Sequence, residues 1–159
     1  MYVFLSCTKK KKDERCKAEE MYQESSLFTK SYQYAKTLNP DKIYILSAKH
    51  YLLPMDEEIN PYNETLNDAS EEEKEEWAHE VLKQMKMANI DFNAKTYFFC
   101  GENYIKYLRE HFKNHEAVFS GKGIGEIMHW LDVQLGNVKE SLSDYLMYQN
   151  EDSVEKYIE

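Results

Sequence analysis

Four short apolar runs constrain the fold of this chain more than any other feature of its sequence. Each run is rich in aromatic or β-branched side chains and is too short for a buried helix, which is typical of a buried strand. The runs are residues 2–6, 42–47, 96–100 and 117–119. Segments with helical periodicity separate them. This alternation predicts an α/β fold, a three-layer sandwich with a mostly parallel sheet of about four strands.

The segments between the runs carry apolar residues every three or four positions, the spacing of a helix with one buried face. The first is predicted as one helix from Ala18 to Leu38, and the second begins at Ser70, which forms a capping box with Glu73. Shorter helices are predicted near 104–112 and 124–135, followed by a helical tail from about residue 138. Residues 48–69 are predicted to be a long loop, and such a loop in a compact domain is usually functional.

Length and composition predict a single domain over residues 1–159, without repeats or a flexible linker. With 42% hydrophobic and 31% charged residues, the chain can form a core without disulfides. Its three cysteines make a poor disulfide framework, which favours a reducing compartment. The first apolar run is too short for a signal peptide, and no segment is apolar over a membrane-spanning length. We therefore expect a cytoplasmic protein with no membrane partner.

The net charge of −9 at pH 7 narrows the choice of partners. It disfavours broad adhesion to nucleic acid, which requires a basic surface, but it leaves room for a local basic groove. It also leaves open an acidic interaction protein that mimics a nucleic-acid surface. Clustered exposed carboxylates and no concave pocket would be the sign of such a protein.

Candidate functional residues follow the predicted strands. In open α/β sheets, ligands bind beyond the carboxyl ends of the strands, and these ends meet at one edge of the sheet. The candidates at this edge are Cys7 and Lys9 after the first run, Ser47, Lys49 and His50 after the second, Glu102 and Tyr104 after the third, and Gly123 and Gly125 after the fourth.

The end of the second run carries the most chemistry. Lys49 can hold an anion, and His50 can transfer a proton near neutral pH. Asp56 in the following loop is a candidate general base beside His50, while Pro61 would present Tyr62 to a ligand. The structural alternative is a solvated lysine, a packed histidine and a polar surface loop.

The remaining ends carry weaker signals. Cys7 beside Lys9 fits a reactive thiol and a phosphate contact, but a small core residue and a solvated loop lysine are the more common roles of such side chains. Gly123 and Gly125 lie between a strand and a helix, where backbone N–H groups bind anions, and a tight structural turn is the alternative. The five histidines are scattered without metal-ligand spacing, so neither a metal nor a cofactor is predicted.

Several of these segments together resemble a known family. The most specific part is the run 45–50 (ILSAKH), followed by Leu52-Leu53, Asp56 and Pro61-Tyr62. From residue 2 to about residue 135, the chain resembles domain-of-unknown-function family 6884 of bacteria and phages. Tyr51 stands where that family usually has Gly, and Asn63 where it often has Asp. The resemblance implies a fold and a site but no activity. At the level of fold, the layout is also similar to nucleobase-handling enzymes of the uracil-DNA glycosylase type.

These patterns favour a protein that binds a nucleotide, a nucleoside or a nucleobase within nucleic acid, and that cleaves or transfers at an N-glycosidic bond. Asp56 or Glu102 would stabilise positive charge on the sugar, while Lys49 and His50 would stabilise the leaving base. The two candidate tyrosines would stack on the base. The alternatives are a protein that sequesters a nucleotide signal without turnover, and the acidic mimic described above.

Overall fold

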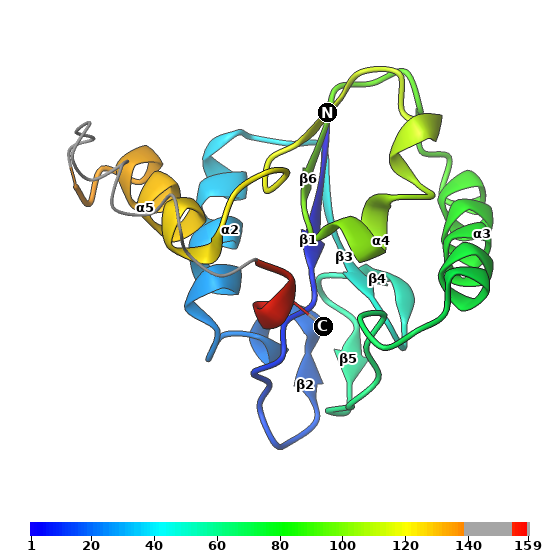
Figure 1. Ribbon diagram of the computed structural model, residues 1–159, viewed down its shortest axis with the longest axis horizontal. Coiled ribbons are helices and arrows are strands. Elements are labelled where there is room, and N and C mark those ends of the chain that lie inside the picture. Colours follow the sequence, from blue (N-terminus) through cyan, green and yellow to red (C-terminus); the bar gives the residue numbers. More distant parts are fainter. Residues whose placement is uncertain (139–153, 159) are drawn as a thin grey trace.

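The computed structural model describes residues 1–138 and 154–158 and has a central sheet between two layers of helices (Figure 1). The sheet has the strand order β4-β3-β1-β6-β7. Its strands are parallel except for β4, which is antiparallel to β3. The strands are β1 (Tyr2–Ser6), β3 (Lys42–Ser47), β4 (Tyr51–Pro54), β6 (Thr96–Phe99) and β7 (His115–Ala117).

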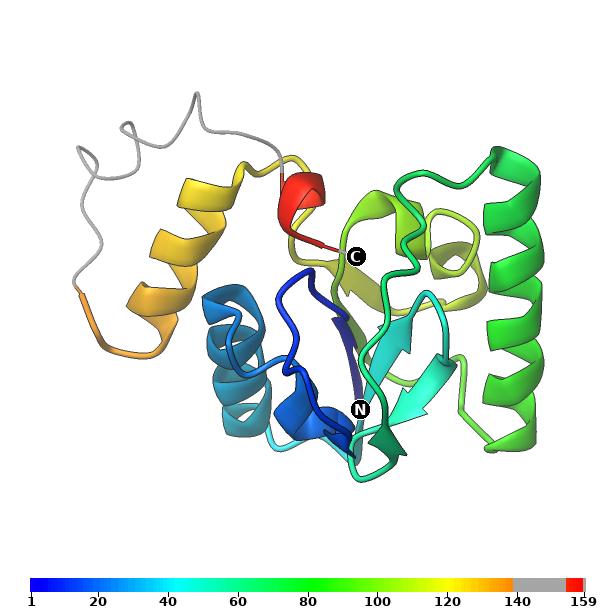
Figure 2. The same ribbon diagram turned by 90° about the horizontal axis from the view of Figure 1, so that it is seen from below.

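Helices cover both faces of the sheet, as the two views in Figures 1 and 2 show. On one face, α2 (Ser26–Thr37) packs on β1, and α5 (Ile124–Gln134) packs beside α2. On the other face, α3 (Glu71–Met87) packs against β4 and against α4 (Glu102–Ile105). The predicted α/β class and three-layer sandwich are confirmed, with one strand added at the edge of the predicted sheet.

The prediction of one continuous helix from Ala18 to Leu38 is wrong, because the structure has two helices in this range. The chain forms α1 (Ala18–Met21), turns, and begins α2 after Ser25. The Ser25 backbone is extended, and its hydroxyl accepts a hydrogen bond from the N–H of Phe28 at 3.2 Å. An N-cap serine satisfies a donor in the first helical turn and so starts a new helix. Apolar periodicity continues across the break, which is why spacing alone did not reveal it.

The predicted loop 48–69 contains two strands. β4 forms a hairpin with β3, and β5 (Glu58–Ile59) pairs antiparallel with β2 (Cys16–Lys17) in a small second sheet. Tyr51 reverses the chain with a φ of 60° and then pairs with Ser47. This left-handed conformation disfavours a residue with a side chain, and it would explain the glycine that the resemblance described above implies at this position.

The remaining differences lie towards the C-terminus. The fourth strand, β7, comes two residues earlier than the predicted run 117–119. The predicted helix 104–112 is split into α4 and the 3₁₀ helix η1 (Arg109–His111). Most of the predicted helical tail falls in 139–153, outside the described residues, and the chain then forms the short 3₁₀ helix η2 (Val154–Tyr157).

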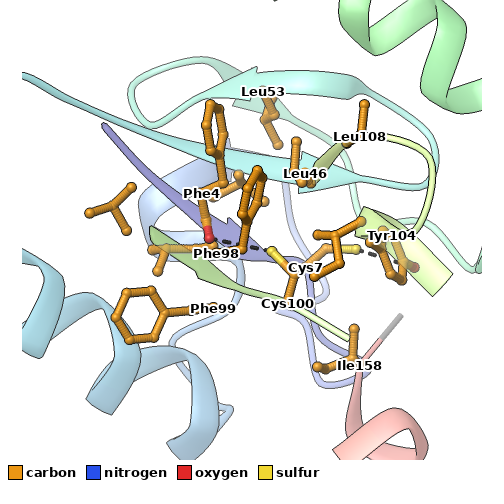
Figure 3. Packing of buried hydrophobic residues seen from close by; sticks show 14 of the residues in the cluster. Phe4, Cys7, Leu46, Leu53, Phe98, Phe99, Cys100, Tyr104, Leu108 and Ile158 are labelled. Atoms are coloured by element: carbon orange, nitrogen blue, oxygen red, sulfur yellow. Dashed lines mark hydrogen bonds between the residues drawn. The ribbon is translucent and has the colours of Figure 1, made fainter. Parts of the chain in front are cut away.

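The core is built around β1, the middle strand of the sheet. The ring of Phe4 is 0% exposed and stacks on Phe98 with ring centroids 5.3 Å apart. Phe112 meets Phe4 edge-on at 5.6 Å. Figure 3 shows Phe4 and Phe98 among buried side chains from several elements, including Leu46 and Leu53. Apolar side chains on β1 are buried on both faces, as expected for a sheet with helices on either side.

We predict that Phe4→Ala lowers the free energy of unfolding by about 3–5 kcal/mol, because it removes a fully buried ring and leaves a cavity in the core. Urea unfolding measures this change. Met87→Ala is the control: Met87 lies at the end of α3 and is 77% exposed, so its loss should change stability by less than about 0.5 kcal/mol. Equal losses in the two variants would contradict this account of the core.

Candidate functional site

The parallel strands bring most of the candidate residues to one edge of the sheet. Cys7 follows β1, Lys49 and His50 follow β3, and Glu102 follows β6. Gly123 comes six residues after the end of β7, at the N-cap of α5. The edge predicted from the sequence therefore exists, and in Figure 1 it lies at the lower end of the strands. Three features make up this edge. They are a buried hydrogen-bond network, the polar residues His50, Lys49 and Glu102 around it, and an open cleft.

The buried network centres on the hydroxyl of Tyr62. Ser47 donates a hydrogen bond from Oγ to this hydroxyl at 2.8 Å, and the hydroxyl of Tyr22 lies 2.6 Å from it. The Ser47 hydroxyl in turn accepts the N–H of His50 at 2.9 Å. Trp77 donates from its indole Nε1 to the Ser47 carbonyl at 3.0 Å. The network ties the loop that carries Tyr62 to the end of β3.

Tyr104 makes a second buried connection at the end of β1. The Cys7 thiol lies 3.6 Å from the Tyr104 hydroxyl (Figure 3). The same hydroxyl accepts a hydrogen bond from the N–H of Leu66 at 3.4 Å. Tyr62 is 7% exposed and Tyr104 is 1% exposed. In this conformation both rings pack inside the protein and hold the 61–66 loop in place, so neither offers an open face on which a base can stack.

His50 lies at the border of this network. Its ring meets Tyr62 edge-on, with centroids 5.3 Å apart, and its buried Nε2 atom has no hydrogen-bond partner among residues 1–138 and 154–158. Burial lowers the pKa of His50, an effect opposed by the negative charge of Glu57 and reinforced by Lys49. The imidazole is therefore mainly neutral at pH 7. Sequence reasoning placed Asp56 beside His50, but Asp56 is exposed, and Glu57 is the carboxylate with the largest effect on the His50 pKa.

The predicted catalytic residues do not form one cluster. Lys49 is exposed at the end of β3. Glu102 begins α4 after β6, where it makes an ion pair with Arg109 at 2.8 Å. Since β1 lies between β3 and β6, the strand ends that carry His50 and Glu102 are about 10 Å apart. A ligand that reaches both must extend along the edge of the sheet.

An open cleft of about 540 Å³ lies at the same edge, on the side of the sheet covered by α2 and α5. It lies where these two helices begin. Its lining residues are Lys9, Lys10, Ser25, Ser26, Leu27, Ile124, Met128 and Tyr157. Of the predicted ligand-binding residues, Lys9 lines the cleft directly, while Gly123 and Gly125 flank the lining residue Ile124 in the chain. Sequence reasoning missed the side of the cleft that residues Ser25–Leu27 form. The sequence feature that could have revealed it is Ser25, the N-cap residue of α2.

The electrostatics of this cleft favour an anion. The N-terminus of a helix carries a partial positive charge and N–H groups that lack partners within the helix. Ser25 caps α2 with its side chain, whereas Gly123 at the N-cap of α5 makes no side-chain cap hydrogen bond. Lys9 and Lys10, both exposed, add positive charge at the mouth of the cleft.

Metal ligation and membrane insertion concern the described ranges, 1–138 and 154–158. No group of three or more His, Cys, Asp or Glu side chains is placed there to hold a metal ion. No helix in these ranges has the length and apolar character needed to cross a membrane.

The fold and the cleft define an α/β protein with an open cleft at the carboxyl edge of a mostly parallel sheet. The model of the family of unknown function DUF6884 matches residues 2–133, and the chain belongs to this family. Comparisons with curated proteins and with solved structures find no significant match. The matched range contains the whole central sheet and both helices that border the cleft, and it ends before η2.

We predict that Tyr62→Phe lowers the free energy of unfolding at pH 7 by about 1–3 kcal/mol, because the buried hydroxyls of Ser47 and Tyr22 lose their shared partner. Urea unfolding measures the loss. Tyr157→Phe, at a 45% exposed tyrosine, is the matched control and should be nearly neutral.

The same variant tests the pH dependence of stability. Burial raises the pKa values of Tyr22 and Tyr62, so folding favours their protonated forms. The wild-type protein should therefore keep this contribution below about pH 10 and lose stability as the pH rises further. Tyr62→Phe should lose stability less steeply above pH 10, since one of the two buried phenols is gone. Identical slopes would contradict the network.

Proposed function

We propose that this protein binds a nucleotide, with its phosphate in the cleft between the N-termini of α2 and α5. The observation that carries this proposal is the convergence of two helix N-termini and two lysines on one open cleft of about 540 Å³. Such a volume falls within the range of small-molecule sites, roughly 300–1,000 Å³. The cleft also lies beyond the carboxyl ends of the strands, where open α/β sheets bind ligands.

The phosphate is held by the start of α5 and by the lysines. Backbone N–H groups in the first turn of a helix bind phosphate directly, and a glycine N-cap lets the anion approach closely. Gly123 supplies that N-cap, and Lys9 and Lys10 neutralise the remaining charge from the loop after β1. The two lysine charges and the N–H groups at the start of α5 thus bind the same anion.

The rest of the ligand contacts an apolar wall. Leu27, Ile124 and Met128 line the cleft from both helices, and such side chains suit the flat face of a nucleobase. The polar and apolar linings together match a ligand with a charged end and an apolar end. This is the reason for favouring a nucleotide over inorganic phosphate alone.

The charge of the whole protein favours a free nucleotide over a nucleic-acid chain. A net charge of −9 repels a polyanion at long range, while a small ligand needs only the local positive charge of the cleft. The cleft also argues against the acidic-mimic alternative, which predicts a surface without a concave pocket. If nucleic acid is a partner, a nucleotide at the end of its strand would occupy the cleft.

Cleavage or transfer at an N-glycosidic bond is the reaction we propose for this edge. Hydrolysis breaks the bond between the sugar C1′ and the base nitrogen; the electron pair leaves with the base, which takes a proton, and water supplies the hydroxyl on C1′. The observation that favours a reaction is the buried Nε2 of His50, which has no hydrogen-bond partner within the part of the chain that the structure describes, since such atoms are rare and call for a role. The buried Nε2 of His50 lies outside the lining of the cleft, so this step requires the His50 side chain to turn towards the ligand. The neutral imidazole then donates a hydrogen bond to the leaving base, assisted by Lys49.

We predict that Lys9→Ala/Lys10→Ala weakens nucleotide binding about tenfold to a hundredfold, because charge-assisted contacts to phosphate are lost. Isothermal titration calorimetry with nucleoside monophosphates measures the affinity, and thermal melts should match wild type. Lys42→Ala is the control, since Lys42 is an exposed lysine at the start of β3, the end opposite the cleft. If the control and the double variant bind alike, the lysines do not contact the ligand.

For the reaction, we predict that wild-type protein releases free base from a nucleotide or nucleoside, and that His50→Ala abolishes the release while the melting temperature stays unchanged. Chromatography of the incubated ligand detects the base. Binding without release of base, in wild type and variant alike, would support the sequestering protein instead. A large fall in the melting temperature of His50→Ala would identify His50 as a structural histidine of the buried network.

A further inference from the structure

Residues 154–158, called the C-terminal segment below, pack on the carboxyl edge of the sheet, beside the proposed nucleotide cleft. Thr8, just after β1, forms an isolated antiparallel bridge with Ile158. Asn67 donates a hydrogen bond from Nδ2 to the Ile158 carbonyl at 2.5 Å. Val154 and Ile158 are 3% and 1% exposed. In Figure 1 the helix η2 lies close to the lower end of the strands, and Figure 3 shows Ile158 below Cys7 and Tyr104.

Tyr157 differs from these anchoring residues. It is 45% exposed, and it lines the cleft together with Lys9, Ile124 and Met128. The buried residues on either side of it, Val154 and Ile158, fix the backbone from which it projects. An exposed aromatic ring on a fixed backbone loses little freedom when a ligand binds, and this makes it an effective contact surface.

The other candidate rings do not offer such a surface. Tyr62 and Tyr104 are packed in the buried network. Over residues 1–138 and 154–158, the large hydrophobic side chains that are exposed are Met87, Val138 and Tyr157, so Tyr157 is the aromatic one among them. Stacking on an aromatic ring contributes to binding for every nucleobase, because each base has a π face.

We infer that Tyr157 is the stacking platform for the nucleobase, an inference that rests on the proposed nucleotide function. The family domain, residues 2–133, supplies the phosphate-binding end of the cleft through Lys9, Lys10 and the start of α5. The C-terminal segment lies outside that domain and supplies the base-binding end. In this arrangement Tyr157 determines the preference for a base-bearing ligand over a bare sugar phosphate.

Ligands with and without a base distinguish the contributions of the two ends of the cleft to binding. The probes are the four nucleoside monophosphates of RNA, of which the tightest-binding is carried forward, and ribose 5-phosphate, which lacks the base. Calorimetric titrations compare wild type, Tyr157→Ala, Tyr157→Phe and Lys9→Ala/Lys10→Ala. Met87→Ala is the matched control, because it shortens another exposed apolar side chain far along the chain from the cleft residues.

Tyr157→Ala should weaken binding of the nucleoside monophosphate about tenfold and leave binding of ribose 5-phosphate unchanged, since only the stacking contact is lost. Tyr157→Phe should bind like wild type, because phenylalanine keeps the ring. The double lysine variant should weaken both ligands, and Met87→Ala should weaken neither.

Three results overturn the inference. If Tyr157→Ala binds the nucleoside monophosphate like wild type while the lysine variant does not, Tyr157 has no part in binding but the proposed function stands. If Tyr157→Ala weakens both ligands equally, Tyr157 supports the shape of the cleft rather than the base. If the wild-type protein binds none of the nucleotides, the proposed function fails and the inference fails with it.

Discussion

The parallel pairing of β1 with both of its neighbours is the constraint on which the rest of the structure depends. Leu5 pairs with Ile45 on one side and with Phe99 on the other, so β1 is enclosed within the sheet. Parallel neighbours cannot be joined by a tight hairpin, and each connection must cross a face of the sheet. The crossings place α2 on one face and α3 on the other, and they bring the ends of the parallel strands to one edge. The position of the candidate site follows from this geometry.

At that edge, two kinds of polar structure have different tasks. The hydroxyl network of Tyr62, Ser47 and Tyr22 is buried, so each group must find a partner inside the protein, and the partners tie the 61–66 loop to β3. The cleft beside α2 and α5 is open, and it is bordered by the N-terminus of α5, which has no side-chain cap, and by two exposed lysines. The buried network stabilises this edge of the sheet, and the open cleft is where we propose that a ligand binds.

Much of the fold was predictable because it depends on local pattern. The apolar runs identified β1, β3 and β6, and the capping box at Ser70 marked the start of α3 within one residue. The edge strand β4 was not predictable in the same way, since its hairpin requires a left-handed Tyr51, a conformation that sequence pattern disfavours. For the candidate site, the edge was predicted, and so was the position of Lys9 in it. The wall formed by Ser25–Leu27 was not, because it depended on a helix break hidden by continuous apolar periodicity.

The sequence by itself determined the class of fold, the alternation of its main strands and helices, and the edge of the sheet where the candidate residues follow the strands, because hydrophobic periodicity is a local property. Tertiary structure alone decided which candidate side chains remain accessible. Tyr62 and Tyr104 read as binding residues in the sequence, yet they are buried, while Tyr157, far away in the chain, lines the cleft. The physical reason is that exposure depends on which distant segments pack together, and the packing of Ile158 beside Thr8 is a contact between opposite ends of the chain.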